Sequence, residues 1–259
     1  MKTMMALSFG LVTLLSATLA AQGTTSLVEV DVTRVLLPAH GFDDNDSVEL
    51  TVDGMLPNGC YQIDGQKVER DEQAKTLTVH QFASKKLDGA CVNEASLPDQ
   101  MTFPRPYTLD VRVGQLASGD YRILYFTNGL TRQNERAFNV AVATEPAIDA
   151  LPYAHVSNVQ VRDVIRTGTR VQALLSGTLL NSCMHLYEDV RVRRDGDVLV
   201  IQPTVRVDPG MCLQYIRPYE KLVDLGRLPE GRYLAHVRSM NGKAVTHVFS
   251  VVTRAQHRR

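Results

Sequence analysis

Apolar and polar residues alternate with a period of two along most of the chain. The alternation is clear at 26–32, 48–52, 75–79 and 107–113 in the first half, and at 156–161, 170–175, 190–193 and 198–201 in the second. This period is typical of half-buried β-strands, and no helical period follows the first residues of the chain. Turn signals such as Asp195-Gly196 and Asn241-Gly242 separate the runs. The pattern predicts an all-β protein with about seven strands in each half, at the spacing of antiparallel β-sandwiches.

A motif with the spacing Gly-x-Leu-x-Asn-x-Cys occurs twice, at 54–60 and at 177–183. A second cysteine follows each copy, and each half ends on a similar tail, at 116–121 and 228–233. Copies of roughly 110–120 residues are large enough to bury their own cores. The repeat therefore predicts two tandem β-sandwich domains, 21–145 and 146–259.

Four cysteines are expected to form two disulfides, one inside each copy. The repeat favours Cys60–Cys91 and Cys183–Cys212, because each copy then closes on itself. A site in which all four cysteines bind one metal ion is the rival interpretation, but the sequence lacks a Cys-x-x-Cys pair.

The start of the chain indicates export. Residues 1–20 combine a charged beginning, a short apolar run and a small-residue ending, as in a secretory signal peptide cleaved after Ala20 or Ala21. No second long apolar run follows, so we expect no transmembrane segment in the mature chain. The predicted location is the periplasm or the exterior of the cell.

Charge is distributed unequally between the halves. Residues 21–145 contain 11 Lys+Arg and 18 Asp+Glu, a net charge of 11 − 18 = −7, whereas residues 146–259 contain 16 and 10, a net of 16 − 10 = +6. The asymmetry could attract the domains to each other or serve a charged partner, or it could reflect unequal solvated surfaces. Nucleic acid is not an expected partner for an exported protein of neutral total charge.

The tail Leu-x-x-Gly-x-Tyr at the end of each half resembles the tyrosine corner of immunoglobulin-like and fibronectin-type sandwiches. Tyr121 and Tyr233 are the matching positions. The resemblance implies a buried ring whose hydroxyl bonds to nearby backbone. The chain has no tryptophan, and its cysteines lie in a turn and an irregular connection, so the likeness does not extend to antibody domains. The two repeated motifs are also similar to those of bacterial exported modules, which implies no defined activity.

Two groups of side chains are candidates for binding. A two-residue turn at Asn241-Gly242 would set His236 opposite His247, close enough to share a metal ion, although a third ligand is missing. Arg191, Arg193 and Arg206 would share one face of a hairpin and could bind an anionic or acidic partner. For each group, the ordinary alternative is the solvated side of a sheet.

The acidic loop 43–46 offers oxygen ligands suited to calcium, but it lacks the spacing of a calcium loop. No hydrolase motif or phosphate-binding glycine loop is present, and we predict neither catalytic residues nor a cofactor. The sequence therefore favours an exported, non-enzymatic binding or structural protein whose partner is a protein or glycan of the envelope or exterior. A metal-dependent or triad-type secreted enzyme and a periplasmic chaperone for surface fibres are the alternatives.

Overall fold

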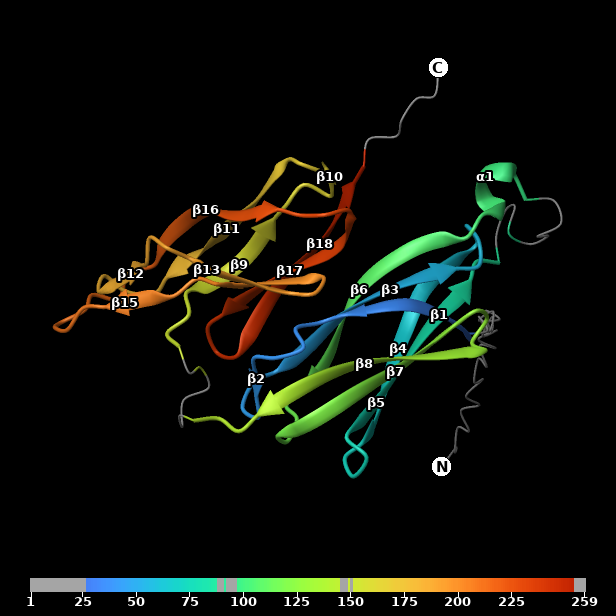
Figure 1. The fold of residues 1–259 in the computed structure, drawn as a ribbon, viewed down its shortest axis with the longest axis horizontal. Coiled ribbons are helices and arrows are strands. Elements are labelled where there is room, and N and C mark those ends of the chain that lie inside the picture. The colour runs from blue at the N-terminus through green and yellow to red at the C-terminus, as the bar shows by residue number, and fades with distance from the viewer. Residues whose placement is uncertain (1–26, 88–90, 92–96, 145–148, 150, 254–259) are drawn as a thin grey trace, which may run out of the picture.

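The computed structural model describes residues 27–87, 91, 97–144, 149 and 151–253. The predicted signal peptide and the predicted junction between residues 145 and 146 lie outside these residues. The described chain is all-β apart from one helical turn, α1 (Asp99–Thr102). Figure 1 shows two β-rich halves side by side.

The described residues of the first half form eight strands: β1 (Leu27–Leu36), β2 (Phe42–Asp43), β3 (Val48–Leu56), β4 (Tyr61–Asp71), β5 (Thr76–Lys85), β6 (Arg105–Gly114), β7 (Gly119–Thr127) and β8 (Arg132–Ala141). Ten strands lie in the part of the second half that the structure describes: β9 (His155–Gln160), β10 (Val164–Arg166), β11 (Arg170–Leu179), β12 (Met184–Leu186), β13 (Arg191–Asp195), β14 (Val198–Gln202), β15 (Val205–Val207), β16 (Arg217–Arg227), β17 (Gly231–Ser239) and β18 (Lys243–Val252).

The two halves have the same strand order. In the second half one sheet runs β10-β18-β17-β14-β13 and faces a second sheet, β16-β11-β9. In the first half β2-β8-β7-β5-β4 and β6-β3-β1 take the corresponding places, and β1 also pairs with β5, which joins the layers. Most pairs are antiparallel, but β2–β8, β5–β7, β10–β18 and β14–β17 are parallel. The shared order supports duplication of one sandwich unit.

Each half has its own apolar core between its sheets. Val52, Val111 and Ile123 belong to the first core, and Leu175, Ile201 and Val237 belong to the second. The strands supply these side chains at alternate positions, because successive side chains of a strand point to opposite faces.

Both tyrosines of the repeated tail are buried beside a phenylalanine. The Tyr121 hydroxyl donates to the Ala117 carbonyl oxygen at 2.9 Å, and the Tyr233 hydroxyl donates to the Pro229 carbonyl oxygen at 3.0 Å. Each bond reaches back four residues, which is the geometry of a tyrosine corner.

The repeated motif begins with glycine because a tyrosine ring packs directly over that position. Gly54 and Gly177 lie under the rings of Tyr107 and Tyr219, and those tyrosines donate to the carbonyl oxygens of Asp31 and His155 on the neighbouring strands, at 2.8 and 3.2 Å. A Cβ atom on either glycine would overlap with both the ring and the carbonyl oxygen. Only glycine leaves this space free. Both tyrosines belong to an Arg-Pro-Tyr tripeptide, at 105–107 and 217–219, so this tripeptide is a further element of the repeat.

The last positions of the motif shape a turn and fix a disulfide. The Asn58 and Asn181 side chains accept from the backbone amides of Cys60 and Cys183, at 2.9 and 3.0 Å. The predicted disulfides, Cys60–Cys91 and Cys183–Cys212, are both present. Figure 1 places α1, which follows Cys91, and the small sheet β12–β15, which adjoins Cys183, at opposite ends of the molecule.

Candidate functional site

The first half covers the outer face of the large sheet in the second half. On β17 every residue from 233 to 239 is buried. Tyr233 and Val237 belong to the core of the second half, whereas Leu234, His236 and Arg238 lie on the opposite face and contact the first half. Burial on both faces therefore distinguishes β17 from an ordinary sandwich strand.

Leu36, at the end of β1, is the apolar centre of this contact. It is fully buried in a cluster whose other members come from the second half: Val198, Val200, Leu234 and Val248. Removing such apolar area from water favours association of the halves.

Arg238 lies beside this apolar cluster and binds three groups of the first half. Its guanidinium donates to the Asp46 carboxylate at 3.2 Å and to the Gly41 carbonyl oxygen, and it lies 4.8 Å above the centre of the Phe42 ring. Only 6% of the Arg238 side chain and 8% of the Asp46 side chain are exposed. Burial raises the pKa of Asp46, and the Arg238 charge opposes that rise. The pair is thus desolvated, and each charge depends on the other.

A second ion pair lies nearer the edge of the contact. Arg232 binds both carboxylate oxygens of Asp53, at 2.6 and 2.9 Å, and donates to the Thr108 hydroxyl at 2.7 Å. The Thr246 hydroxyl is 3.0 Å from both carboxylate oxygens of Asp110. These contacts bring acidic groups of the first half against donors of the second, so part of the charge asymmetry acts between the halves.

His236 and His247 lie on opposite faces of their hairpin, which contradicts the sequence-based pairing. The turn contains three residues, 240–242, so His247 faces Ala235 and His236 faces Thr246. A shift of one residue turns a side chain to the other face of a sheet. His247 is 3.2 Å from the Asp163 carboxylate, whereas His236 packs edge-on against Phe42. The two imidazoles cannot share a metal ion in this register.

His236 is buried, and neither of its ring nitrogens has a hydrogen-bond partner in the described part of the chain. Burial, together with the charge of Arg238, holds the pKa of His236 well below its ordinary value of 6.5. The neutral imidazole is therefore the form that fits the contact between the halves.

We expect acid to weaken the protein through His236. Below about pH 6.5 the unfolded state gains a proton on this ring that the folded state does not accept, so the free energy of unfolding falls as the pH falls. In urea titrations from pH 7 to pH 5, His236→Phe should lose less stability than the wild type. Asp46 is present in both proteins, so its contribution to the pH dependence of the free energy of unfolding cancels in the comparison. His40→Gln, which removes an exposed imidazole, is the matched control; equal acid losses in the wild type and His236→Phe would contradict the assignment.

The three predicted arginines do not form one stripe. Arg191 and Arg193 lie on β13 and line a pocket of about 460 Å³ with Gly41 and Arg238, and Arg193 donates to the His40 carbonyl oxygen at 2.9 Å. Arg206 lies on β15, which pairs with β12 instead, and it contacts Asp208 at 2.9 Å. Arg193 therefore fastens the two halves together, and Arg206 belongs to a separate sheet.

The acidic loop 43–46 also takes part in the contact between the halves. The Asp46 carboxylate accepts from the Asp43 backbone amide at 3.0 Å and from Arg238, and the Asp44 carboxylate accepts from the Ala143 amide at 3.0 Å. Within the described residues no three His, Cys, Asp or Glu side chains are grouped so as to hold a metal ion.

A loop of the second half exposes a run of large apolar side chains that the sequence analysis missed. In the loop 208–216 the exposed fraction is 97% for Met211, 71% for Leu213 and 67% for Ile216, and Tyr215 is also exposed. The sequence signal for this surface is the apolar run around Cys212, at 211–216. Scattered exposed apolar residues are ordinary, but a continuous group marks a binding surface.

Covalent and hydrogen bonds hold the same loop against the repeated turn. The Cys183–Cys212 disulfide joins it to the repeated turn, and Ser182 and Leu213 exchange hydrogen bonds of 3.0 Å. The Asp208 amide also donates to the Cys183 carbonyl oxygen, at 3.0 Å. A fixed loop loses little conformational freedom when it binds.

Comparison with known proteins identifies the second half by fold only. Residues 173–251, which are 251 − 172 = 79 of the 259 residues, match the family described as the ORF11 beta-sandwich domain. This match begins in β11 and ends in β18. No curated protein matches the chain. Among the described residues, no helix has the length and apolar character needed to cross a membrane.

Proposed function

We propose that the protein is an exported, non-enzymatic binding protein, in which two joined β-sandwiches present the loop 208–216 to a protein partner. The observation that carries the proposal is the exposure of Met211, Leu213, Tyr215 and Ile216 on a loop fixed by a disulfide. The two disulfides indicate an oxidising compartment outside the cytoplasm, and the start of the sequence supports export.

The surroundings of the loop favour a protein partner over an anionic membrane. Arg206 and His185 both contact Asp208 at the start of the loop, so the base of the loop carries charges of both signs. An apolar centre of methionine, tyrosine and aliphatic residues within a polar rim is typical of protein–protein interfaces. An anionic bilayer would instead favour an excess of basic residues around the apolar group.

The test is capture of partners from envelope extract with immobilised mature protein. The triple variant Met211→Ser/Leu213→Ser/Ile216→Ser should lose at least tenfold of a partner that the wild type retains in both 0.1 M and 1 M salt. An apolar contact persists at high salt, whereas a contact between exposed charges weakens. The matched control is Leu27→Ser/Val142→Ser, which removes exposed apolar side chains from the first half.

Capture that is equal for the wild type and the loop variant would contradict the proposal, as would capture that disappears at high salt. The loop side chains are exposed, so the variant should keep the wild-type unfolding midpoint, and a circular-dichroism melt verifies this before capture.

A further inference from the structure

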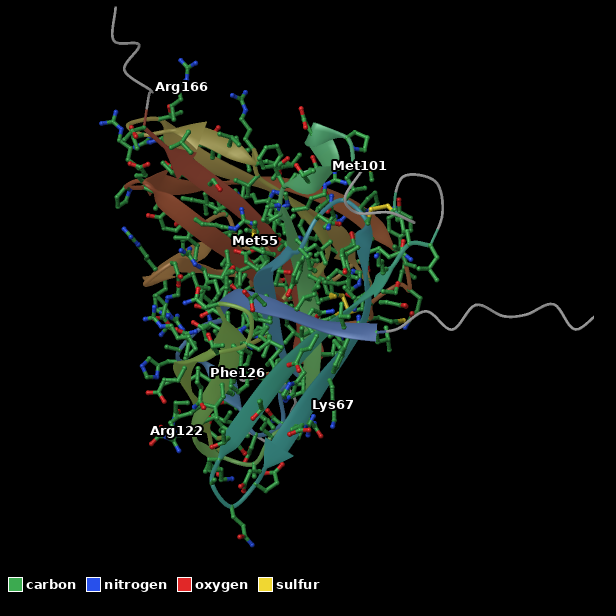
Figure 2. All side chains as sticks on the ribbon, turned by 90° about the vertical axis from the view of Figure 1, so that its right-hand side faces the viewer. Met55, Lys67, Met101, Arg122, Phe126 and Arg166 are labelled. Carbon is green, nitrogen blue, oxygen red and sulfur yellow. A yellow bond between two sulfur atoms is a disulfide. The ribbon has the colours of Figure 1, made fainter. Side chains whose placement is uncertain are left out.

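Three arginines converge on a pocket at the end of the second half, away from the loop 208–216. Arg162, Arg166 and Arg170 line this pocket, whose volume is about 480 Å³, together with Val164, Ile165, Thr169 and Gln172. Arg162 precedes β10, Arg166 ends it, and Arg170 begins β11. Figure 2 shows Arg166 at this end, projecting from the ribbon.

The positive charge of this pocket is only partly neutralised. Arg170 is 3.3 Å from the Asp224 carboxylate, but within the described chain neither Arg162 nor Arg166 has an acidic side chain within 4.0 Å. The neighbouring Asp163 is instead 3.2 Å from His247. Arg170 also lies directly opposite Arg227 in the β11–β16 ladder, and like charges placed opposite each other are unfavourable. A bound anion would relieve this repulsion.

The fold itself does not require arginines here. Strand β2 of the first half corresponds to β10, since both pair in parallel with the last strand of their half. Asp43 faces Ala141 in the first half at the place where Arg166 faces Val252 in the second. The acidic loop in the first half faces Arg238, whereas the basic segment in the second half faces solvent.

The geometry points to a phosphate-bearing ligand for this pocket. Guanidinium groups pair with phosphate and carboxylate oxygens through parallel hydrogen bonds. Three guanidinium groups surround the pocket, and a phosphate ester offers them up to three free oxygens, whereas a carboxylate offers two. The Thr169 hydroxyl and the Gln172 amide supply further donors, and Ile165 and Val164 supply apolar contact for the organic part of the ligand. We propose that this pocket binds the phosphate group of a soluble phosphate ester or of a lipid headgroup.

The first experiment titrates the full mature protein with inorganic phosphate and follows backbone amide resonances by NMR. Saturable shifts are expected at residues 161–172, with weaker binding as sodium chloride is raised. Arg162→Gln/Arg166→Gln should weaken this binding at least tenfold. Arg122→Gln/Arg132→Gln removes the same charge from exposed positions of the first half and should leave it unchanged. A chain ending at Thr253, which lacks the arginine-rich end of the sequence, should also bind as the full chain does.

The second experiment identifies the source of the phosphate. A lipid headgroup is supported if the protein floats with phosphatidylglycerol vesicles but not with phosphatidylcholine vesicles, and if Arg162→Gln/Arg166→Gln abolishes this flotation. Binding of inorganic phosphate without flotation supports a soluble ester. The proposal is overturned if phosphate shifts no resonance of residues 161–172, or if Arg162→Gln/Arg166→Gln binds phosphate as the wild type does. It is also overturned if the chain ending at Thr253 loses phosphate binding, because the binding arginines would then lie in the removed end. None of these results depends on the loop 208–216, so the proposed function stands or falls separately.

Discussion

Replacing Arg238 with methionine should lower the free energy of unfolding by about 3–5 kcal/mol, the range found when one partner of a buried ion pair is removed. Methionine fills much of the same space but leaves the Asp46 carboxylate buried without its partner cation. It also removes the donor to the Gly41 carbonyl oxygen and the cation above the Phe42 ring. Urea denaturation of the whole mature chain at pH 7 measures the loss.

Two further variants separate the charge from the shape of the side chain. Arg238→Met/Asp46→Leu removes both charges and should recover most of the loss, because replacing a buried pair with apolar residues is often nearly neutral. Arg112→Ala breaks the pair between Arg112, whose side chain is 86% exposed, and the partly buried Glu49, and it should change stability by no more than about 1 kcal/mol. An Arg238→Met cost as small as that of Arg112→Ala would show that the buried pair contributes nothing to the contact between the halves.

Replacing Gly177 with alanine should cost about 3 kcal/mol or more, a large effect for one added methyl group. The new Cβ atom would overlap with the His155 carbonyl oxygen and would stand 2.8 Å from the Tyr219 hydroxyl oxygen. The strands β9 and β11 would have to separate, and the Tyr219 hydrogen bond would break with them. Thermal unfolding followed by circular dichroism measures the effect.

The matched control is Gly65→Ala on β4. Its Cβ would have Phe82 Cβ at 3.9 Å as its nearest neighbour, so a change of no more than about 0.5 kcal/mol is expected. Gly177→Ala/Tyr219→Phe removes the hydroxyl but not the backbone overlap, and it should remain as unstable as Gly177→Ala. Recovery of stability in that double variant would assign the clash to the tyrosine alone. A Gly177→Ala protein as stable as Gly65→Ala would contradict the glycine–tyrosine arrangement altogether.

The sequence predicted the strands, the all-β class and both disulfides because each depends on local pattern or on the repeat. Apolar and polar residues alternate at 48–52 and 170–175 because each strand buries one of its faces. Cys60 and Cys183 occupy the same position of the repeated motif, which favoured one disulfide within each half. The repeat also includes the tyrosines that explain Gly54 and Gly177, but these lie 107 − 54 = 53 and 219 − 177 = 42 residues further along the chain and meet the glycines only across the sheet.

The contact between the halves was not predictable from period alone. Residues 233–239 include His236 and Arg238 between apolar residues, and a strand buried on both faces no longer alternates. The histidine pairing failed for a different reason, because Asn241-Gly242 is part of a three-residue turn and the register of a hairpin follows its turn length. The sequence does not reveal the exposed loop, because an apolar run has the same pattern whether a disulfide holds it in the core or in solvent.

The first half has the same large sheet as the second, but the outer face of this sheet is uncovered. If the contact between the halves were repeated between molecules, a second molecule would pack on this face. Val198, Val200 and Leu234 receive Leu36 in the second half, but Thr76, Thr78 and Arg122 occupy the equivalent places in the first. Figure 2 shows Arg122 on that uncovered side.

Leu36 itself is replaced by Gln160 at the equivalent position of the second half. A head-to-tail contact that does not close on itself generates open filaments. The polar residues at these positions of both surfaces provide neither the apolar surface nor the leucine that the contact between the halves uses, so they disfavour filament growth through this contact.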